Sequence, residues 1–327
     1  VWPATAAAFG LLDSPRAEAT LTHLSRDRIS ADWGAHMLST ESVFYDPMAY
    51  NSGAVWPFVT GFVSWGQYRY QRPWAGYHLM DALRQMTFDW ARGRHPELLS
   101  GSYYRPLDAA VPQQFFATSM LITSVLQGML GWEPDAPRSR AMLTPQLPPQ
   151  WEDVRVRKLR VGETSIDLTI WQHREETVVE LDGHGPKVTV DVVLPVPMGA
   201  RSVDGAPKAR VDASGRRVTV QLDVEGAKAK ARLRWKNGLV IEPPTVELEP
   251  GQRSLGVRVL DFRYAEGVWR VDIEGMAGKT YEIRFRGEPL SGVEGGRLVH
   301  RRGDITTVAV QFPAGRGRKE TKVRLIR

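Results

Sequence analysis

The chain contains no cysteine, and its first 150 residues contain no lysine. Without cysteine, disulfides, thiolate metal sites and thiol nucleophiles are excluded, although an oxidising compartment is not distinguished from a reducing one. Long apolar runs are also missing, and a helix that crosses a bilayer needs about 20 apolar residues. We therefore expect no membrane partner, and the localisation stays open between cytoplasm and periplasm.

The composition that is present is ordinary for a globular protein of 327 residues, with 42% hydrophobic and 24% charged residues. This length suits about two or three domains. Charge is divided unevenly, because the chain up to Gln150 carries 11 basic and 12 acidic residues and the rest carries the other 32 basic and 25 acidic ones. The net charge splits into −1 and +7, which suggests domains with different roles.

The first part of the chain has the patterns of helices. Ser14-Pro15 combines an N-cap with a first-turn proline, which predicts a helix start. From Leu79 to Trp90, apolar residues step by four, three and four positions, the spacing of one buried helical face. The predicted helices are Pro3–Leu12, Ser14–Ser25, Gly53–Tyr70, Trp74–Arg92 and Pro112–Leu130.

The rest of the chain has the patterns of strands. Prolines between Glu133 and Gln150 predict a stiff linker. Beyond it, segments such as Val154–Val161 alternate polar and apolar residues between closely spaced turns, which indicates an antiparallel sandwich. Ile241–Pro244 predicts a second linker before further strands. The expected domains are a helical domain at 1–133, a linker at 134–150, a β-sandwich at 151–238 and a smaller β-domain at 239–327.

The basic residues of the second part do not form a nucleic-acid surface. Arg157, Lys158 and Arg160 are diluted by Asp and Glu in neighbouring strands, whereas a nucleic-acid site needs a clustered basic stripe with stacking aromatics. We expect solvated sheet faces and no nucleic-acid partner.

Three loop-like segments combine aromatic or turn residues with polar groups: Asp32–Ser39, Tyr50–Pro57 and His95–Gly101. Sugars present apolar faces ringed by hydroxyls, so a sugar site joins aromatic platforms to carboxylates, amides and imidazoles. These segments are therefore candidates for a carbohydrate site.

Glu97 is the best single candidate for catalysis within them. Pro96 fixes its entry and Gly101 permits a sharp exit between two predicted helices. Glycoside hydrolysis needs two carboxyl groups, one acting as acid and one as base or nucleophile. The alternative is an ordinary loop carboxylate that pairs with Arg94 or His95.

Four motifs together resemble a known family: Tyr50–Pro57, Pro96-Glu97-Leu98 with Gly101, Val111–Gln114 and Leu143–Pro149. The chain over roughly 1–161 looks like the C-terminal part of bacterial amylo-α-1,6-glucosidase (glycogen debranching) glycosidases. That type is an (α/α)6 toroid of six inner and six outer helices, similar to glucoamylase and trehalase. The resemblance implies that Glu97 is the general base, and that a sugar subsite is lined by Trp33, His36, Tyr50, Trp56 and Gln113.

Two departures from the family shape the expectation. Family members tend to place Arg where this chain has His36, and their general acid lies upstream of anything matched here. Five helices make less than half a toroid, and the chain begins with Val1, so we expect the last portion of the barrel followed by β-domains. Uncovered apolar surface would then favour a homo-oligomer, a second chain that completes the toroid, or β-domains folded over the gap.

If the chain acts alone, its second carboxyl must come from Asp32, Glu41, Asp46 or Asp108. Asp32 is preferred because it lies next to Trp33 in the loop before the second matched segment.

The sequence therefore predicts a multidomain α + β protein: a partial (α/α)6-toroid helical domain followed by antiparallel β-sandwich domains. The predicted function is a glycoside hydrolase of an oligosaccharide or α-glucan, acting by inversion with Glu97 as base. A non-catalytic carbohydrate-binding fragment, or a glycosidase of another linkage such as β-galactosidase, stays open. No cofactor is expected because phosphate-loop and dinucleotide motifs are missing, and no metal because the histidines lack ligand spacing.

Overall fold

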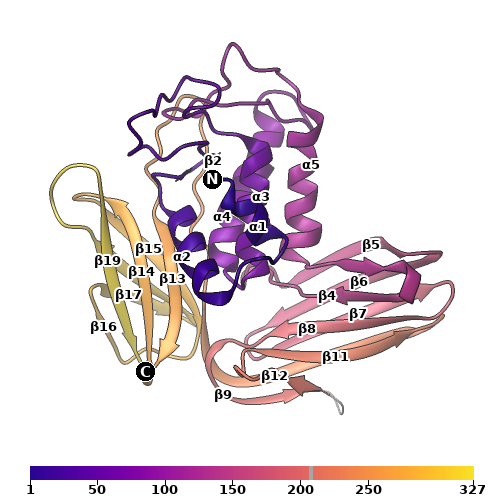
Figure 1. The fold of residues 1–327 in the computed structure, drawn as a ribbon. Coiled ribbons are helices and arrows are strands. Elements are labelled where there is room, and N and C mark those ends of the chain that lie inside the picture. Colours follow the sequence, from indigo (N-terminus) through magenta and orange to yellow (C-terminus); the bar gives the residue numbers. More distant parts are fainter. Residues whose placement is uncertain (206–208) are drawn as a thin grey trace.

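The computed structural model describes residues 1–205 and 209–327 and has one helical region and two β-regions. In Figure 1 the helices gather at the top centre, one β-region lies below them and the other lies to the left. The protein is thus a multidomain α + β protein. Its described residues contain five α-helices, too few for a complete (α/α)6 toroid, so the toroid stays a proposal. Over the same residues, no helix has the length and apolar character that a membrane span requires.

Each of the five predicted helices is present; the Ser14–Ser25 helix has the predicted bounds, and the other four are shorter than predicted. The observed bounds are α1 Pro3–Ala8, α2 Ser14–Ser25, α3 Pro57–Arg69, α4 Pro73–Asp89 and α5 Phe115–Thr123, which continues as π-helix over Ser124–Met129. The cap of α2 is Asp13, whose Oδ1 accepts a hydrogen bond from the Arg16 N–H at 3.0 Å. The prediction of Ser14 as the cap is therefore wrong by one residue, and Ser14 is the first residue of the helix.

Glycines let the helices approach one another closely. A Cβ on Gly76 of α4 would lie 2.7 Å from the ring of Tyr68 on α3, and one on Gly61 of α3 would lie 2.4 Å from Cβ of Met120 on α5. These close approaches leave no room for a larger residue. They bring α3, α4 and α5 together and so place the loops at the ends of these helices side by side.

The β-regions contain most of the chain's strands. After β1 (Ser30–Ala31) and β2 (Gly34–Ala35) come β3 Glu133–Asp135, β4 Arg140–Leu143, β5 Asp153–Val161, β6 Thr164–His173, β7 Glu176–His184, β8 Val188–Pro195, β9 Met198–Gly205, β10 Arg210–Val211, β11 Arg217–Val224, β12 Lys228–Ile241, β13 Arg258–Ala265, β14 Val268–Met276, β15 Thr280–Gly287, β16 Gly292–Glu294, β17 Arg297–Arg302, β18 Ile305–Gln311 and β19 Arg318–Ile326.

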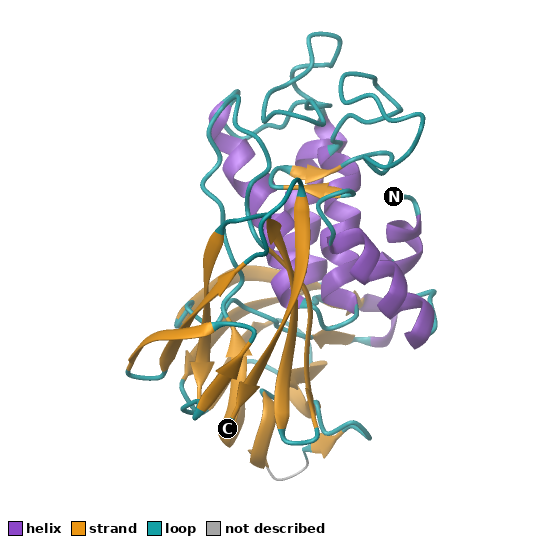
Figure 2. Cartoon of the chain, turned by 90° about the vertical axis from the view of Figure 1, so that its left-hand side faces the viewer, coloured by secondary structure: helices purple, strands orange, loops and turns teal. Residues whose placement is uncertain are grey.

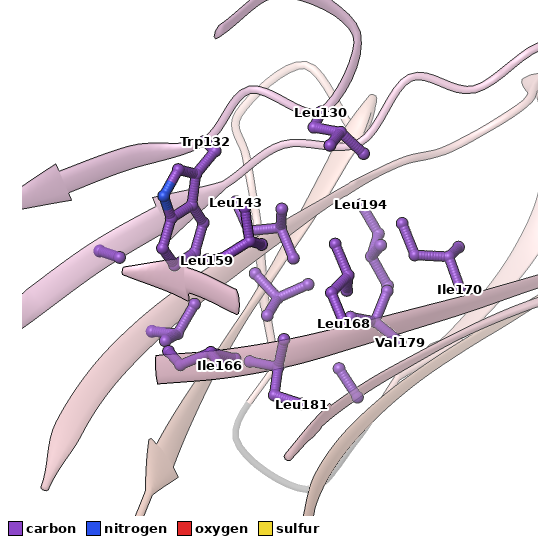
Figure 3. Packing of buried hydrophobic residues seen from close by; sticks show 14 of the residues in the cluster. Leu130, Trp132, Leu143, Leu159, Ile166, Leu168, Ile170, Val179, Leu181 and Leu194 are labelled. Atoms are coloured by element: carbon purple, nitrogen blue, oxygen red, sulfur yellow. The ribbon is translucent and has the colours of Figure 1, made fainter. Parts of the chain in front are cut away.

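Two sheets form the first β-region. One has the order β10-β11-β8-β4-β3 and faces the β5, β6 and β7 part of an eight-stranded sheet. The core between them contains Leu143, Ile166, Leu168 and Leu181, shown in Figure 3. The pairing is antiparallel except between β4 and β8. The Pro-rich segment 134–150, predicted as a linker, therefore contains β4 and takes part in this sheet.

Strand β12 belongs to both β-regions. It pairs with β7 over Lys228–Arg234, and its last three residues, Leu239–Ile241, pair with β15. The predicted boundary at 238/239 thus falls within a continuous strand. In the second β-region, β13-β14-β19-β16 packs on β15 and β18 around the buried Trp269 and Phe285.

Candidate functional site

The three segments singled out from the sequence meet in the loops above the helices. Single β-bridges join His36 to Val55, Val55 to Leu99, and Leu99 to Pro106. Val55 and Leu99 exchange both backbone hydrogen bonds at 2.9 Å. Figure 2 shows these loops gathered at the end of the helical region. Residues that lie far apart in the sequence therefore form one platform.

Glycine is required in this platform for space. A Cβ on Gly101 would lie 2.4 Å from the carbonyl oxygen of Gly53 and 2.5 Å from the hydroxyl of Tyr45. Contacts this short do not occur between real side-chain and backbone atoms. Gly101 therefore lets two loops touch through their backbones.

Glu97 lies at the edge of this platform and is only 7% exposed. Its carboxylate accepts a hydrogen bond from the Tyr50 hydroxyl and, through Oε2, a second one from the Val111 N–H at 3.0 Å. The Glu97 N–H in turn donates to the Val111 carbonyl at 2.9 Å. Gln114, the residue before α5, has an extended backbone, and α5 begins at Phe115 rather than at the predicted Pro112.

The neighbours of Glu97 in sequence do not pair with it. The Arg94 guanidinium donates to the side chain of Gln113, an exposed residue of the same segment. His95 is fully buried and lies within hydrogen-bond distance of the carbonyl oxygens of Leu83 and Ala117. Burial lowers the His95 pKa. The alternative partners considered for Glu97, Arg94 and His95, therefore hold other groups.

Two aromatic rings stand next to Glu97. Tyr50 and Trp56 pack edge to face with 5.0 Å between ring centres, and the Trp56 Nε1–H donates to the Tyr50 carbonyl at 3.0 Å. Tyr50 is 40% exposed, and its hydrogen bond to Glu97 raises its pKa. We call Tyr50, Trp56 and Glu97 the Glu97 cluster. It joins a carboxylate to partly exposed aromatic rings, which is the composition of a sugar site.

Trp33 and His36 lie inside the platform. Trp33 is fully buried, and its Nε1–H donates to the Ser100 carbonyl at 2.9 Å. His36 is 2% exposed, and its Nε2 lies 3.0 Å from the Gly101 carbonyl oxygen. Burial lowers the His36 pKa. Protein atoms cover both rings, which therefore support the loop that carries Glu97 rather than present a surface to a ligand.

Asp32 turns away from the Glu97 cluster toward the second β-region. Its Oδ1 lies 2.7 Å from a guanidinium nitrogen of Arg258, and its Oδ2 accepts the N–H groups of Leu255 at 2.8 Å and Gly256 at 3.0 Å. Burial opposes the charge of Asp32, but Arg258 and these backbone donors outweigh it and hold the pKa at about 2. A carboxyl in this state holds no proton near neutral pH, so the geometry argues against Asp32 as a general acid.

Sequence reasoning missed the groups that hold these residues. Arg258 belongs to β13 and has no local motif that links it to Asp32. The sequence marks Val111 only as part of a helix start, although Pro112 disfavours a helical backbone at the residue before it and was the one available signal. Among the described residues, no group of three or more His, Asp or Glu side chains is arranged to hold a metal ion.

Comparisons with known proteins give distant similarities. No protein-family model and no curated protein matches the chain. It is similar to the α-L-rhamnosidase from Dictyoglumus thermophilum, with 10% identity and a TM-score of 0.44 over 71% of this chain and 25% of that one. It is also similar to the cycloalternan-forming enzyme from Listeria monocytogenes in complex with a pentasaccharide substrate, with 13% identity and a TM-score of 0.24 over 57% of this chain and 21% of that one. The chain thus spans a quarter or less of these structures. Both are carbohydrate-active enzymes, and the glycogen-debranching type stays a prediction.

Proposed function

We propose that the chain is part of a glycoside hydrolase acting on an oligosaccharide or α-glucan, with Glu97 as the general base of an inverting reaction. The observation that supports this most is the Glu97 cluster. A buried carboxylate accepts two hydrogen bonds next to Tyr50, an aromatic side chain that is 40% exposed.

The chemistry follows from the hydrogen bonds that Glu97 still lacks. Each oxygen of an ionised carboxylate can accept about two hydrogen bonds, and each oxygen of Glu97 accepts one. A water molecule can therefore donate to Glu97 while Tyr50 and Val111 hold the carboxylate in place. As this water attacks the anomeric carbon, its proton passes to Glu97, and the partner acid protonates the departing glycosidic oxygen.

The partner acid is the open part of this proposal. Glu41 pairs with Arg28 at 2.8 Å, which leaves the exposed Asp46 and Asp108 among the carboxyl groups considered. The other source is a second chain that covers α5, where Phe115 is 89% exposed. Phe116 and Ile122 of the same helix are also exposed, and grouped exposed apolar side chains are typical of a contact surface.

A second candidate function is carbohydrate binding without turnover. The ion pair of Asp32 with Arg258 favours it, because this pair removes the preferred acid from the reaction. It predicts saturable oligosaccharide binding and no release of reducing sugar.

The test compares the wild type with Glu97→Gln on nitrophenyl glycosides and gluco-oligosaccharides. Removing a general base lowers kcat by about 10²- to 10⁴-fold, and we expect a loss of that size without a loss of folding. Glu225→Gln, at an exposed glutamate between β11 and β12, is the matched control and should retain full activity. Turnover by Glu97→Gln at the wild-type rate would refute the assignment of the base, and binding without turnover by the wild type would support the second candidate.

A further inference from the structure

A cavity of about 370 Å³ lies where the helical region meets both β-regions. It is lined by the start of α4, the end of β6, the second half of β12 and the end of β15. Its volume lies within the range of about 300 to 1,000 Å³ that is typical of small-molecule sites, which also favour the junctions between domains. We call it the junction cavity. None of its lining residues belongs to the Glu97 cluster.

Aromatic side chains from two regions line this cavity. Trp74 and Tyr77 come from α4 and Trp235 comes from β12. Trp74 packs edge to face on Phe262, with 5.9 Å between ring centres, and Tyr77 does so on Trp151, also at 5.9 Å. These contacts hold the rings in place before any ligand arrives, so a flat apolar ligand face would meet an ordered surface.

Gln71 reaches this cavity from an unfavourable backbone conformation. Its φ is 61°, in the left-handed region that favours glycine. The turn is held by hydrogen bonds from the Gln71 N–H to the Tyr68 carbonyl and from the Arg72 N–H to the Gln67 carbonyl, both at 3.0 Å. Within the described chain, the Gln71 side-chain amide has no hydrogen-bond partner. A strained backbone that carries an amide to a cavity points to a functional position.

Two further glutamines present acceptors to the cavity. The Gln146 Nε2 donates to the Tyr68 carbonyl at 2.8 Å, and the Gln172 Nε2 donates to the Trp151 carbonyl at 2.9 Å. These bonds fix both amides by their nitrogen, and the amide oxygens have no partner among the described residues. The Tyr77 hydroxyl, on a side chain that is only 6% exposed, likewise has none there.

The charges on the cavity lining nearly balance. Arg174 and Arg216 are opposed by Glu152 and Asp304, and Arg286 shares the carboxylate of Glu242 with Arg284. An anion would therefore meet two carboxylates here as well as the arginines. A neutral ligand that both donates and accepts hydrogen bonds suits this lining better.

We propose that the junction cavity binds a neutral mono- or disaccharide, at a site separate from the Glu97 cluster. The apolar face of a pyranose ring lies on an aromatic ring, and its hydroxyls donate to the glutamine oxygens and accept from Tyr77 and the arginines. Because the ligand touches the helical region and both β-regions, its binding also holds the three together. This site does not depend on catalysis by Glu97.

The test measures binding of D-glucose and maltose by isothermal titration calorimetry to the whole chain, with D-glucuronate and benzoate as anionic probes. We expect the sugars to bind in about the millimolar range. Trp235→Ala should weaken this binding about tenfold or more. Gln71→Gly should weaken it without loss of stability, because glycine relieves the left-handed backbone. Trp171→Ala, at a tryptophan of β6 outside the cavity lining, is the control and should bind like the wild type.

Three results would overturn the proposal: neither sugar binds, Trp235→Ala binds like the wild type, or an anionic probe binds more tightly than both sugars. Glu97→Gln separates this proposal from the proposed function. Sugar binding that is retained in Glu97→Gln but lost in Trp235→Ala supports the junction cavity, whatever the turnover. Binding lost only in Glu97→Gln would place the sugar at the Glu97 cluster and refute the separate site.

Discussion

Asp32→Asn is the most informative single change, because the sequence suggests a proton donor and the structure gives a buried anion. Its carboxylate lies 2.7 Å from the Arg258 guanidinium, and the two side chains are 0% and 3% exposed. Replacing Asp32 by Asn keeps the shape of the side chain and removes the charge. Arg258 then keeps Asp27, at 3.3 Å, as its ion-pair partner, with a further contribution from the charge of Glu274.

The expected loss follows from the burial of this pair. Removing one partner of a buried ion pair costs about 3 to 5 kcal/mol, and because Asp27 remains, we expect about 3 kcal/mol. The pKa of Asp32 gives a second value for this loss of stability. A shift of the Asp32 pKa from 3.8 in the unfolded chain to about 2 corresponds to about 2 kcal/mol of stability at neutral pH. Because the folded pKa is the lower one, this stability is fully present above about pH 4 and is lost as the pH falls toward 2.

The assay is urea unfolding of the wild type and Asp32→Asn from pH 7 down to pH 2, with circular dichroism and tryptophan fluorescence as two probes of one transition. Asp153→Asn is the control, because its pair with Arg155 has side chains that are 43% and 65% exposed and should contribute less than about 1 kcal/mol. The difference between wild type and Asp32→Asn should shrink below pH 4. A stable but inactive Asp32→Asn protein would refute this reasoning and return Asp32 to the reaction.

Three further changes test other parts of the structure. Burial lowers the pKa of His78 from 6.5 to about 3, so the unfolded chain binds a proton at a higher pH than the folded chain does. The free energy of unfolding should therefore fall by about 2 kcal/mol between pH 6.5 and pH 5. In urea titrations, His78→Gln should make the free energy of unfolding less dependent on pH over this range. Gly101→Ala should lower the free energy of unfolding by about 1 to 3 kcal/mol and disturb the Glu97 cluster. Its control is Gly292→Ala, whose added Cβ meets nothing closer than 3.4 Å and which should unfold at nearly the wild-type urea concentration. Trp269→Ala, at a fully buried ring, should lower the free energy of unfolding by about 3 to 5 kcal/mol. A fall in melting temperature no larger than that of Gly292→Ala would contradict the packing of Trp269 in the core of the second β-region.

The sequence predicts most of the elements because their signals are local. The spacing from Leu79 to Trp90 predicts α4, although the helix ends at Asp89. Alternation predicts β6, where Ile166, Leu168 and Ile170 point into one core. In these elements the spacing of apolar residues along the sequence agrees with their burial, because each element has one face toward a core and one toward solvent.

Pairing between distant segments is what the sequence does not predict. The Pro-rich segment 134–150 was expected to be a linker, yet Arg140–Leu143 pairs in parallel with β8. All prolines of the segment lie outside β4, and Pro134 belongs to the edge strand β3, so every N–H group of β4 is available for pairing. A four-residue strand is too short to show its own period.

The candidate site likewise has a part that the sequence predicts and a part that depends on pairing between distant segments. Glu97 stands in a local motif, and the structure adds Tyr50 and Trp56 as neighbours. Asp32 and Trp33 look equally suitable by local pattern, but their role depends on Arg258 and Ser100. Adjacent residues thus have different surroundings, which no pattern in the sequence specifies.

The segment before β13 explains why the loops of the helical region and the second β-region depend on each other. Residues 246–256 run along these loops. Leu248 donates to the side chain of Gln85 at 2.9 Å, and Tyr104 exchanges backbone hydrogen bonds with Gln252 and Gly251 at 2.9 and 2.8 Å. Tyr104 in turn packs against Trp33, with 6.2 Å between ring centres, and Trp33 holds the loop that follows Glu97. The second β-region therefore supports the Glu97 cluster through this segment and through Arg258, and its removal would leave both the buried Asp32 and the Trp33 loop without their partners.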